Sequence, residues 1–309
     1  MENQRIDIKA YMALIVVCIV WGTTYLAFKV GVKVFPSFLF GAIRQMSAGI
    51  ILLSTILIIK KNIKWTWRDV RLQILPGIFM ITMGNGIVGY ALKFIPSGLA
   101  ALLCSMMPLY IILINLLINR KDKLNAQIII GLVLGFVGVL IVFRDNISFL
   151  GNKNYLFGIF IALISCFFWA LGTIFSQRNK ASTDIFFNAS LQFIIGGTGL
   201  FFLSFLFDDW KNITQIPTSA IWALIYLIFI GSILGFICYL YALSKLPVGL
   251  VSVYAYINPL VAIMLGFILL NETITIYTAL AFVVIVSGIY LVNTGYQIKK
   301  REREELINS

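Results

Sequence analysis

The feature that most limits the fold of this chain is a series of apolar runs, each long enough to cross a lipid bilayer. A helix of about 20 residues spans the hydrocarbon core, which is about 30 Å thick. The sequence therefore predicts ten transmembrane helices, at residues 11–30, 37–59, 73–94, 97–118, 125–143, 155–176, 186–206, 219–243, 247–270 and 273–296. Because 61% of the residues are hydrophobic and 12% are charged, we exclude a water-soluble fold and expect an all-α polytopic membrane protein in contact with the lipid bilayer.

The first apolar run is interpreted as a retained helix and not as a cleaved signal peptide. It continues through Trp21 to Tyr25 and shows no small-residue cleavage site. The longest connection, roughly Lys60 to Leu72, is too short to form a domain of its own. We therefore expect every functional residue to lie within the helix bundle.

The basic residues predict the orientation of the bundle. With the N-terminus inside, cytoplasmic segments hold 17 Lys and Arg residues and outer segments hold 6. Lys and Arg are enriched on the cytoplasmic side of membrane proteins. We therefore expect a multi-pass protein of the cell (inner) membrane with both termini in the cytoplasm. This scatter among short loops also explains the net charge of +12 without nucleic-acid binding.

A stretch near the middle of the first half is written again in the second half. Tyr90–Leu109 reads YALKFIPSGLAALLCSMMPL, and Tyr241–Leu260 reads YALSKLPVGLVSVYAYINPL. Further matches pair Trp21 with Trp169 at an offset of 148 residues and Gly84 with Gly235 at 151. Five spans in each half force the second copy to enter from the opposite side, as in the inverted repeats of many carriers. We expect repeats at 1–145 and 152–298, followed by a cytoplasmic tail at 299–309.

These motifs, in this order and spacing, carry a family resemblance over nearly the whole chain. They are WGTTYLAFK, AIRQMSAGIILL, YALKFIPSGLAALL and GLVLGFVGVLIV in the first half, and LLNETIT and VSGIYLV in the second. The chain resembles the EamA family of the drug/metabolite transporter (DMT) superfamily. The resemblance implies ten helices, a central cavity between two five-helix repeats, and export of small metabolites such as amino acids or drugs.

Two prolines lie at matching points of the repeat, Pro108 and Pro259, about eleven residues into their spans. At 1.5 Å per residue that is about 16 Å, close to the bilayer centre. Proline removes a helix hydrogen bond, so a freed carbonyl at this depth predicts a substrate contact. The alternative is a packing kink. If the functional interpretation holds, four neighbours line the site: Ser105, Tyr110, Tyr254 and Asn258.

Trp21 and Trp169 lie in the middle of their spans, away from the interfacial belt where tryptophan usually anchors a helix. Thr24 and Thr173 follow at three and four residues, so each shares the helix face of its tryptophan. This pattern predicts a paired aromatic floor of the cavity, and helix–helix packing is the alternative.

Arg44 is a charge well inside a span, so it should face the bundle interior or extend toward the outer surface. Lys29 and Lys93 end their spans on the same side, while Gln192, the repeat partner of Arg44, is neutral. We hypothesise a positive outer half of the cavity that orients a substrate carboxylate. The alternative is lysines that reach the interface, together with a structural contact between Arg44 and Glu272.

Two more polar residues are candidates for the site. Glu272 is expected in the first turn of the last helix, where an acid complements the helix dipole, and we group it with Lys29 and Lys93 as an outer charge cluster. Asn85, between two glycines of the third span, has two equally weighted interpretations: a bond to substrate or a bond to a neighbouring helix.

Histidine is absent, which excludes a histidine–zinc site and a Ser-His triad, and all twelve acids lie outside the apolar cores. We therefore expect no cofactor, no metal, no catalytic residue and no membrane-buried carboxylate of the kind that proton-coupled carriers use. The preferred interpretation is a monomeric secondary transporter that exports a small-molecule substrate by alternating access. The alternatives are a carrier of lipid- or nucleotide-linked sugars, an intramembrane enzyme, or a sensor.

Overall fold

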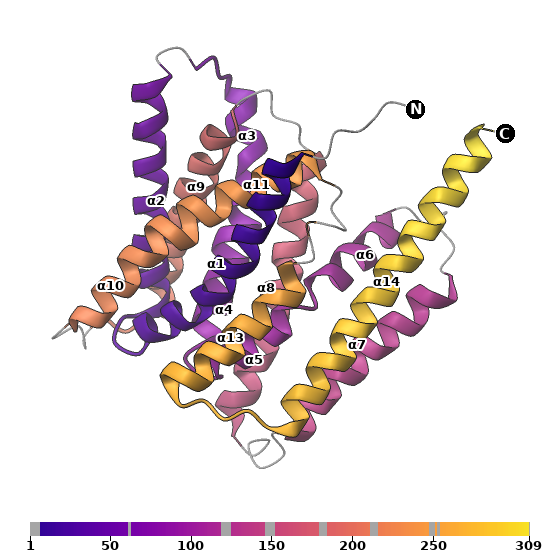
Figure 1. Ribbon diagram of the computed structural model, residues 1–309. Helices are drawn as coiled ribbons and strands as arrows, with labels where there is room; N and C mark the ends of the chain where they lie inside the picture. The colour runs from indigo at the N-terminus through magenta and orange to yellow at the C-terminus, as the bar shows by residue number, and fades with distance from the viewer. Residues whose placement is uncertain are drawn as a thin grey trace.

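A computed structural model describes residues 7–60, 63–118, 125–145, 152–178, 184–210, 216–246, 251 and 254–308. Within these residues every regular element is a helix and no strand is present (Figure 1). Every predicted span contains helix, as expected of a chain whose backbone polar groups must be satisfied inside lipid.

The first half begins with two long helices and continues with broken ones. Its elements are α1 (Ile8–Val32), α2 (Ser37–Ile59), α3 (Trp67–Pro76), the π-helix η1 (Gly77–Gly86), α4 (Ile87–Ala91), α5 (Ser97–Cys104), α6 (Met107–Ile118) and α7 (Ala126–Asp145). Local signals set several starts. The Asp7 carboxylate accepts from the Ala10 N–H at the start of α1, and Thr66 and Asp69 form a capping box on α3.

The second half repeats this order. Its elements are α8 (Lys153–Arg178), α9 (Ile185–Phe207), α10 (Thr218–Tyr226), the π-helix η3 (Leu227–Leu234), α11 (Gly235–Lys245), α13 (Tyr254–Leu270) and α14 (Ile276–Asn308). The last helix continues through the basic and acidic residues expected as a tail, because Lys, Arg and Glu are good helix formers.

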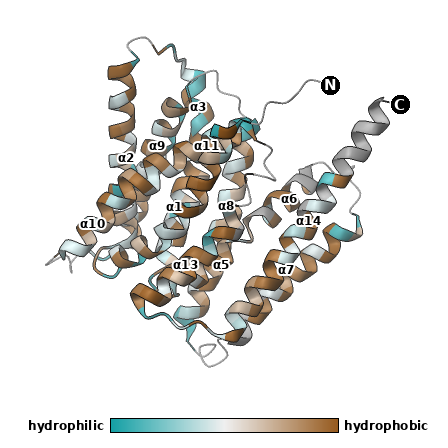
Figure 2. Ribbon diagram, in the orientation of Figure 1, coloured by the Kyte–Doolittle hydropathy of each residue, from teal (hydrophilic) through white to brown (hydrophobic). Residues whose placement is uncertain are grey.

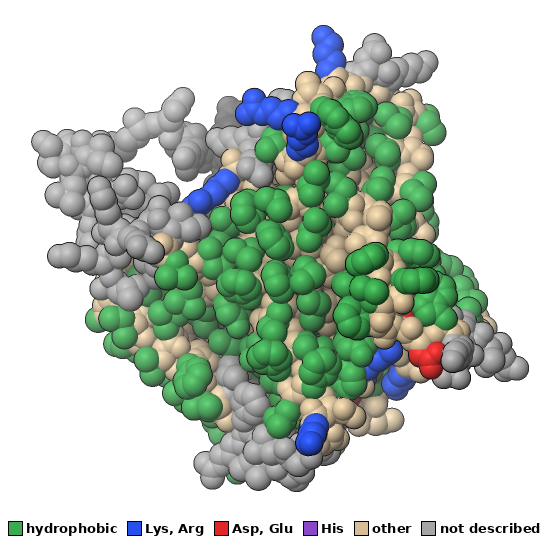
Figure 3. Space-filling model, turned by 180° about the vertical axis from the view of Figure 1, so that it is seen from behind, with side chains coloured by type: hydrophobic (Ala, Val, Ile, Leu, Met, Phe, Trp, Pro, Cys, Tyr) green, Lys and Arg blue, Asp and Glu red, His purple; other side chains and the backbone are tan. Residues whose placement is uncertain are grey.

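Seven helical segments of the described residues are long and apolar enough to cross a membrane, and three further apolar helices are shorter. The surface agrees with a lipid environment. Hydrophobic residues predominate along the helices, and hydrophilic residues gather near the helix ends (Figure 2). On the face seen from behind, hydrophobic side chains cover the middle, while Lys and Arg lie toward the two ends (Figure 3). A membrane-embedded protein needs such a belt.

The two halves interlock instead of packing as separate bodies. The repeat-equivalent helices α2 and α9 lie side by side, and so do α7 and α14 (Figure 1). Helix α1 of the first half packs against α13 and α11 of the second, while α8 of the second packs against η1 of the first. The centre of the molecule is therefore built from both repeats.

Candidate functional site

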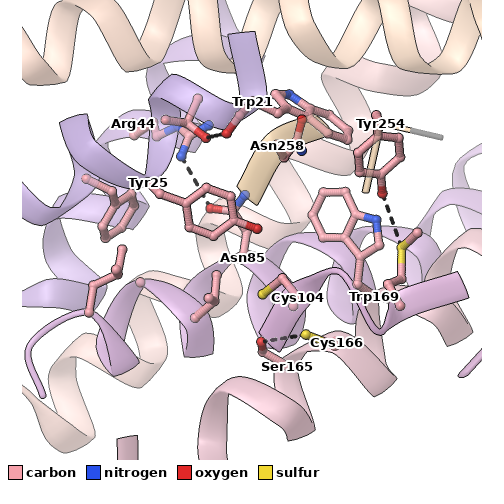
Figure 4. A pocket seen from close by; sticks show the side chains of 17 residues that line it. Trp21, Tyr25, Arg44, Asn85, Cys104, Ser165, Cys166, Trp169, Tyr254 and Asn258 are labelled. Carbon is pink, nitrogen blue, oxygen red and sulfur yellow. Dashed lines mark hydrogen bonds between the residues drawn. The ribbon is translucent and has the colours of Figure 1, made fainter. Parts of the chain in front are cut away.

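A cavity lies where the two halves meet. Its empty volume is ≈ 690 Å³, with the open solvent at its mouth included. Its walls are contributed by Trp21, Thr24, Tyr25, Phe28, Arg44, Gly84, Asn85, Val88, Gly89, Leu92, Cys104, Met107, Ser165, Cys166, Trp169, Tyr254 and Asn258 (Figure 4).

One side of the cavity is aromatic. The Trp21 ring meets the Trp169 ring edge to face, with centroids 5.5 Å apart and planes at 90°. It meets Tyr254 at 5.1 Å and 89°, and Tyr239 packs behind it at 4.9 Å. Edge-to-face pairs match the positive edge of one ring to the negative face of another. Since these rings come from α1, α8, α11 and α13, the expected aromatic floor is formed jointly by the two repeats.

Two glycines at equivalent positions make room for the indoles. A Cβ atom on Gly235 would lie 2.6 Å from Trp21 Nε1, and one on Gly84 would lie 3.0 Å from Trp169 Cε3. Each tryptophan therefore packs directly on helix backbone of the other half. The sequence match of Gly84 with Gly235 was the signal of this contact, but the sequence alone did not connect it with the tryptophans.

The two indole N–H groups differ in their partners. Trp21 Nε1 donates to the carbonyl oxygen of Gly231 at 3.2 Å. Trp169 Nε1 is buried without a hydrogen-bond partner, although the hydroxyls of Tyr239 and Tyr254 lie near it. A buried indole N–H usually has a partner. The second tryptophan therefore lacks the backbone acceptor that the first one has.

Arg44 lies on the other side of the cavity and is 4% exposed. Its Nε donates to Ser232 Oγ at 2.8 Å, and its Nη1 reaches Asn85 Oδ1 at 3.4 Å. The guanidinium also lies 5.9 Å from the centroid of the Phe28 ring. None of the described residues that line the cavity is acidic. The Arg44 charge is therefore stabilised by neutral groups and not by Glu272, the partner considered above.

The polar residues around Arg44 come from two π-helices that sequence analysis did not anticipate. Asn85 belongs to η1 and Ser232 to η3, which occupy corresponding places in the two halves. Ser232 Oγ also donates to Gln45 Oε1 at 3.2 Å. Ser232 of η3 is therefore hydrogen-bonded to two consecutive residues of α2, Arg44 and Gln45. π-Helical turns occur often at functional sites. The sequence carries no periodic signal for this altered winding.

Of the expected site residues, seven line the cavity: Trp21, Thr24, Arg44, Asn85, Trp169, Tyr254 and Asn258. Asn258 also ties α13 to α1. With its amide turned so that nitrogen faces the acceptors, Nδ2 lies 2.8 Å from the Cys18 carbonyl and 3.0 Å from the Tyr254 carbonyl. Tyr254 in turn donates to Met107 Sδ at 3.1 Å.

Four expected residues lie outside the cavity lining, namely Ser105, Tyr110, Thr173 and Gln192. Ser105 donates to the Leu102 carbonyl, and Tyr110 packs edge to face on Phe167.

Thr173 donates to the Trp169 carbonyl and shares a hydrogen bond with the Tyr239 hydroxyl. Gln192 donates through Nε2 to Gln73 Oε1 at 2.6 Å, between α9 and α3. Unlike its repeat partner Arg44, Gln192 therefore serves helix packing.

The two prolines do not have matching structures. The helix of the first copy is broken, since α5 ends at Cys104 and α6 begins at Met107, immediately before Pro108. In the second copy α13 runs from Tyr254 to Leu270 with the buried Pro259 inside it. The helix is therefore interrupted just before the proline in the first copy and is continuous through the proline in the second. Pro259 does not line the cavity, and the side chain of Pro108 lies outside the described residues.

The expected outer charge cluster also needs correction. Lys29 Nζ donates to the carbonyls of Leu92 and Ile95, at 2.6 and 2.7 Å, just after α4 ends. Glu272 accepts from the N–H and hydroxyl of Ser97, at 2.9 and 2.8 Å, where α5 begins.

Each charge thus complements the dipole of the helix end it meets. Glu272 serves α5 and not the last helix, which begins only at Ile276. Lys93 is exposed and lies 5.3 Å from the centroid of the Tyr90 ring. Lys29, Lys93 and Glu272 therefore all lie at the turn between α4 and α5. Of the three basic residues expected in the outer half, Arg44 is the one that lines the cavity.

Sequence analysis missed several lining residues, among them Tyr25 and the thiols of Cys104 and Cys166. Cys166 is buried and Cys104 is half-buried at the cavity (Figure 4). Within the described residues, no group of three His, Cys, Asp or Glu side chains is placed to hold a metal.

Comparison with known proteins identifies the class of protein that this fold and cavity define. The model of the EamA-like transporter family matches residues 8–144 and again residues 156–294. The chain therefore belongs to the EamA-like transporter family and contains two of its repeats.

Several relatives resemble the chain over most of its length. It is 29% identical to the uncharacterized inner membrane transporter YedA of Escherichia coli (strain K12) over 286 residues, which cover 92% of this chain and 90% of that protein. It is 25% identical to the uncharacterized transporter YoaV of Bacillus subtilis (strain 168), covering 92% and 96%. A solved crystal structure superposes with a TM-score of 0.67 at 18% identity, covering 92% of this chain and 96% of that one, and shares its fold.

Proposed function

We propose that this membrane protein is a secondary transporter that exports a small organic solute, such as an amino acid or a drug-like molecule. The observation that carries the proposal is the cavity at the junction of the two repeats, lined from both halves by aromatic rings and one buried arginine. In this proposal ten transmembrane helices form two inverted repeats, which rock about the cavity to expose it to each side in turn. The protein moves its substrate without changing it chemically.

The proposed location of the protein is the cell (inner) membrane, with both termini in the cytoplasm. Three findings support this placement. The excess of Lys and Arg falls on the side that holds the termini. The start of α1 and the end of α14 lie toward the same end of the bundle (Figure 1). A relative is named as an inner membrane transporter. Export, as opposed to uptake, rests on the family resemblance.

The test is transport by the purified protein in liposomes loaded with labelled amino acids and small aromatic carboxylates. We expect efflux that exceeds that of protein-free liposomes and releases the solute chemically unchanged. A modified product would overturn the transporter in favour of an enzyme. No flux for any member of a broad panel, from correctly folded protein, would also contradict the proposal.

The cavity thiols provide a matched control for the route. Cys104 and Cys166 line the cavity, whereas Cys18 and Cys238 do not. A maleimide small enough to enter should block flux through the wild-type protein and through a C18S/C238S variant. A C104S/C166S variant should resist. Equal block of both variants would mean that the solute does not pass through this cavity.

An uncoupler tests the coupling. In the part of the chain that the structure describes, no acidic side chain lines the cavity, and proton-coupled carriers commonly use a membrane-embedded carboxylate or histidine. We therefore expect flux down a solute gradient to persist when the proton gradient is collapsed.

A further inference from the structure

We infer that the substrate of this cavity is an organic anion with an apolar, planar body, of the class of the aromatic carboxylates, and that Arg44 is its counter-charge. The inference rests on the proposed function and narrows it. In this inference, the Arg44 side of the cavity binds the carboxylate of the substrate, and the aromatic side binds its apolar body.

The first step of the argument is the charge. Arg44 is 4% exposed, yet its hydrogen bonds go to a hydroxyl and a side-chain amide, both neutral. A buried cation is costly unless it is paired, and a guanidinium binds a carboxylate through two parallel hydrogen bonds. The Arg44 guanidinium lies beside Ser232, Asn85 and the Phe28 ring, and none of these three is acidic. An arriving anion would supply the missing partner.

The second step is the shape of the opposite side. Arg44 and Asn85 lie toward one side of the cavity, and Trp169 and Tyr254 lie toward the other (Figure 4). The far side carries two aromatic rings, the Met107 thioether and the indole N–H of Trp169 that lacks a partner. Rings and polarizable sulfur favour an apolar or aromatic body.

The third step excludes the other charge types. A zwitterion such as phenylalanine brings an ammonium group, and a cation such as an arylalkylamine brings only that group. Among the described residues, no acidic side chain lines the cavity to pair with it. Aromatic faces attract cations, but Arg44 already places one positive charge in the same space. The charge balance therefore favours a net negative solute over a neutral or positive one of equal size.

The test compares three molecules with one skeleton: 3-phenylpropanoate, phenylalanine and 2-phenylethylamine. Binding to the purified full-length protein is measured by isothermal titration calorimetry, and efflux is measured in liposomes. We expect 3-phenylpropanoate to bind most tightly and 2-phenylethylamine least. Arg44→Gln should weaken the binding of 3-phenylpropanoate by about tenfold or more, which is the usual effect of losing a charge-assisted hydrogen bond. The affinity for phenylalanine should change much less.

Three matched variants separate charge from structure. Ser232→Ala removes the bond that holds Arg44 Nε but keeps the guanidinium, so the order of the three molecules should persist. Arg44→Lys keeps the charge and should also keep the order. Lys93→Gln removes one positive charge from an exposed site outside the cavity and should change nothing.

The outcomes distinguish this inference from the proposed function. Tighter binding of phenylalanine or 2-phenylethylamine, an unchanged affinity in Arg44→Gln, or no binding of any of the three would overturn the anion assignment. Efflux of phenylalanine in preference to 3-phenylpropanoate would keep the transporter and remove the assignment. Binding of 3-phenylpropanoate without efflux of any tested solute would keep the anion site and remove the transporter.

Discussion

The two halves of this protein place a tryptophan at the same point of the same fold and use it differently. Trp21 packs on Gly235 and donates to the Gly231 carbonyl, whereas Trp169 packs on Gly84 and leaves its donor unused. The packing follows the repeat, but the hydrogen bonding does not. Repetition has therefore preserved the scaffold, while the polar groups that a ligand would meet have diverged.

The second helix of each half shows the same division. Arg44 of α2 reaches the cavity, and its counterpart Gln192 of α9 is bonded to Gln73 away from it. Both side chains are buried, and both bond a helix of the opposite half. A single charged residue at one of two equivalent positions thus gives the cavity a positive side and a neutral side.

The largest effect is expected from filling the glycine positions under the tryptophans. Gly235→Ala forces a methyl group against the Trp21 ring, and overpacking of this kind costs about 1–3 kcal/mol. Gly84→Ala should cost less, because its nearest atom is 3.0 Å away and not 2.6 Å. Thermal unfolding in detergent measures both. Equal losses would mean that the two halves pack alike.

A smaller effect is expected at the turn between α4 and α5. Glu272→Gln keeps the shape but removes the negative charge that caps Ser97, and loss of a helix cap costs about 0.5–2 kcal/mol. Lys29→Met should destabilise the other end of the same turn by a similar amount. The check is again thermal unfolding, with Lys93→Gln as the exposed control. A fully stable Glu272→Gln variant would show that the second half does not support this turn.

The smallest effect is expected in the difference between two matched tryptophan substitutions. Trp21→Phe removes the bond to Gly231 and should cost about 0.5–1.5 kcal/mol of the free energy of unfolding beyond the loss of ring area. Trp169→Phe makes the same change in size but breaks no such bond, so its cost should be lower. The difference between the two melting temperatures isolates the hydrogen bond. A larger loss in Trp169→Phe would contradict the difference between the halves.

Much of the candidate site was open to prediction because two kinds of signal are local. A tryptophan or an arginine in the middle of an apolar run is conspicuous, since neither belongs in lipid, and Trp21, Trp169 and Arg44 do line the cavity. Cys104 and Tyr25 gave no such signal, because a small or aromatic residue is ordinary in a membrane helix. Ser105 and Thr173 looked like candidates but satisfy their hydroxyls on nearby groups.

The sequence by itself determined the helical membrane fold, the repeat and the identity of the unusual residues, because hydropathy and periodicity are properties of short segments. Only the tertiary structure decided which of those residues meet. Glu272 caps a helix 175 residues away, and Trp21 finds its acceptor 210 residues away in a π-helix. Such contacts depend on how segments from two repeats cross. The apolar pattern of each segment is compatible with many crossings, and packing selects one of them.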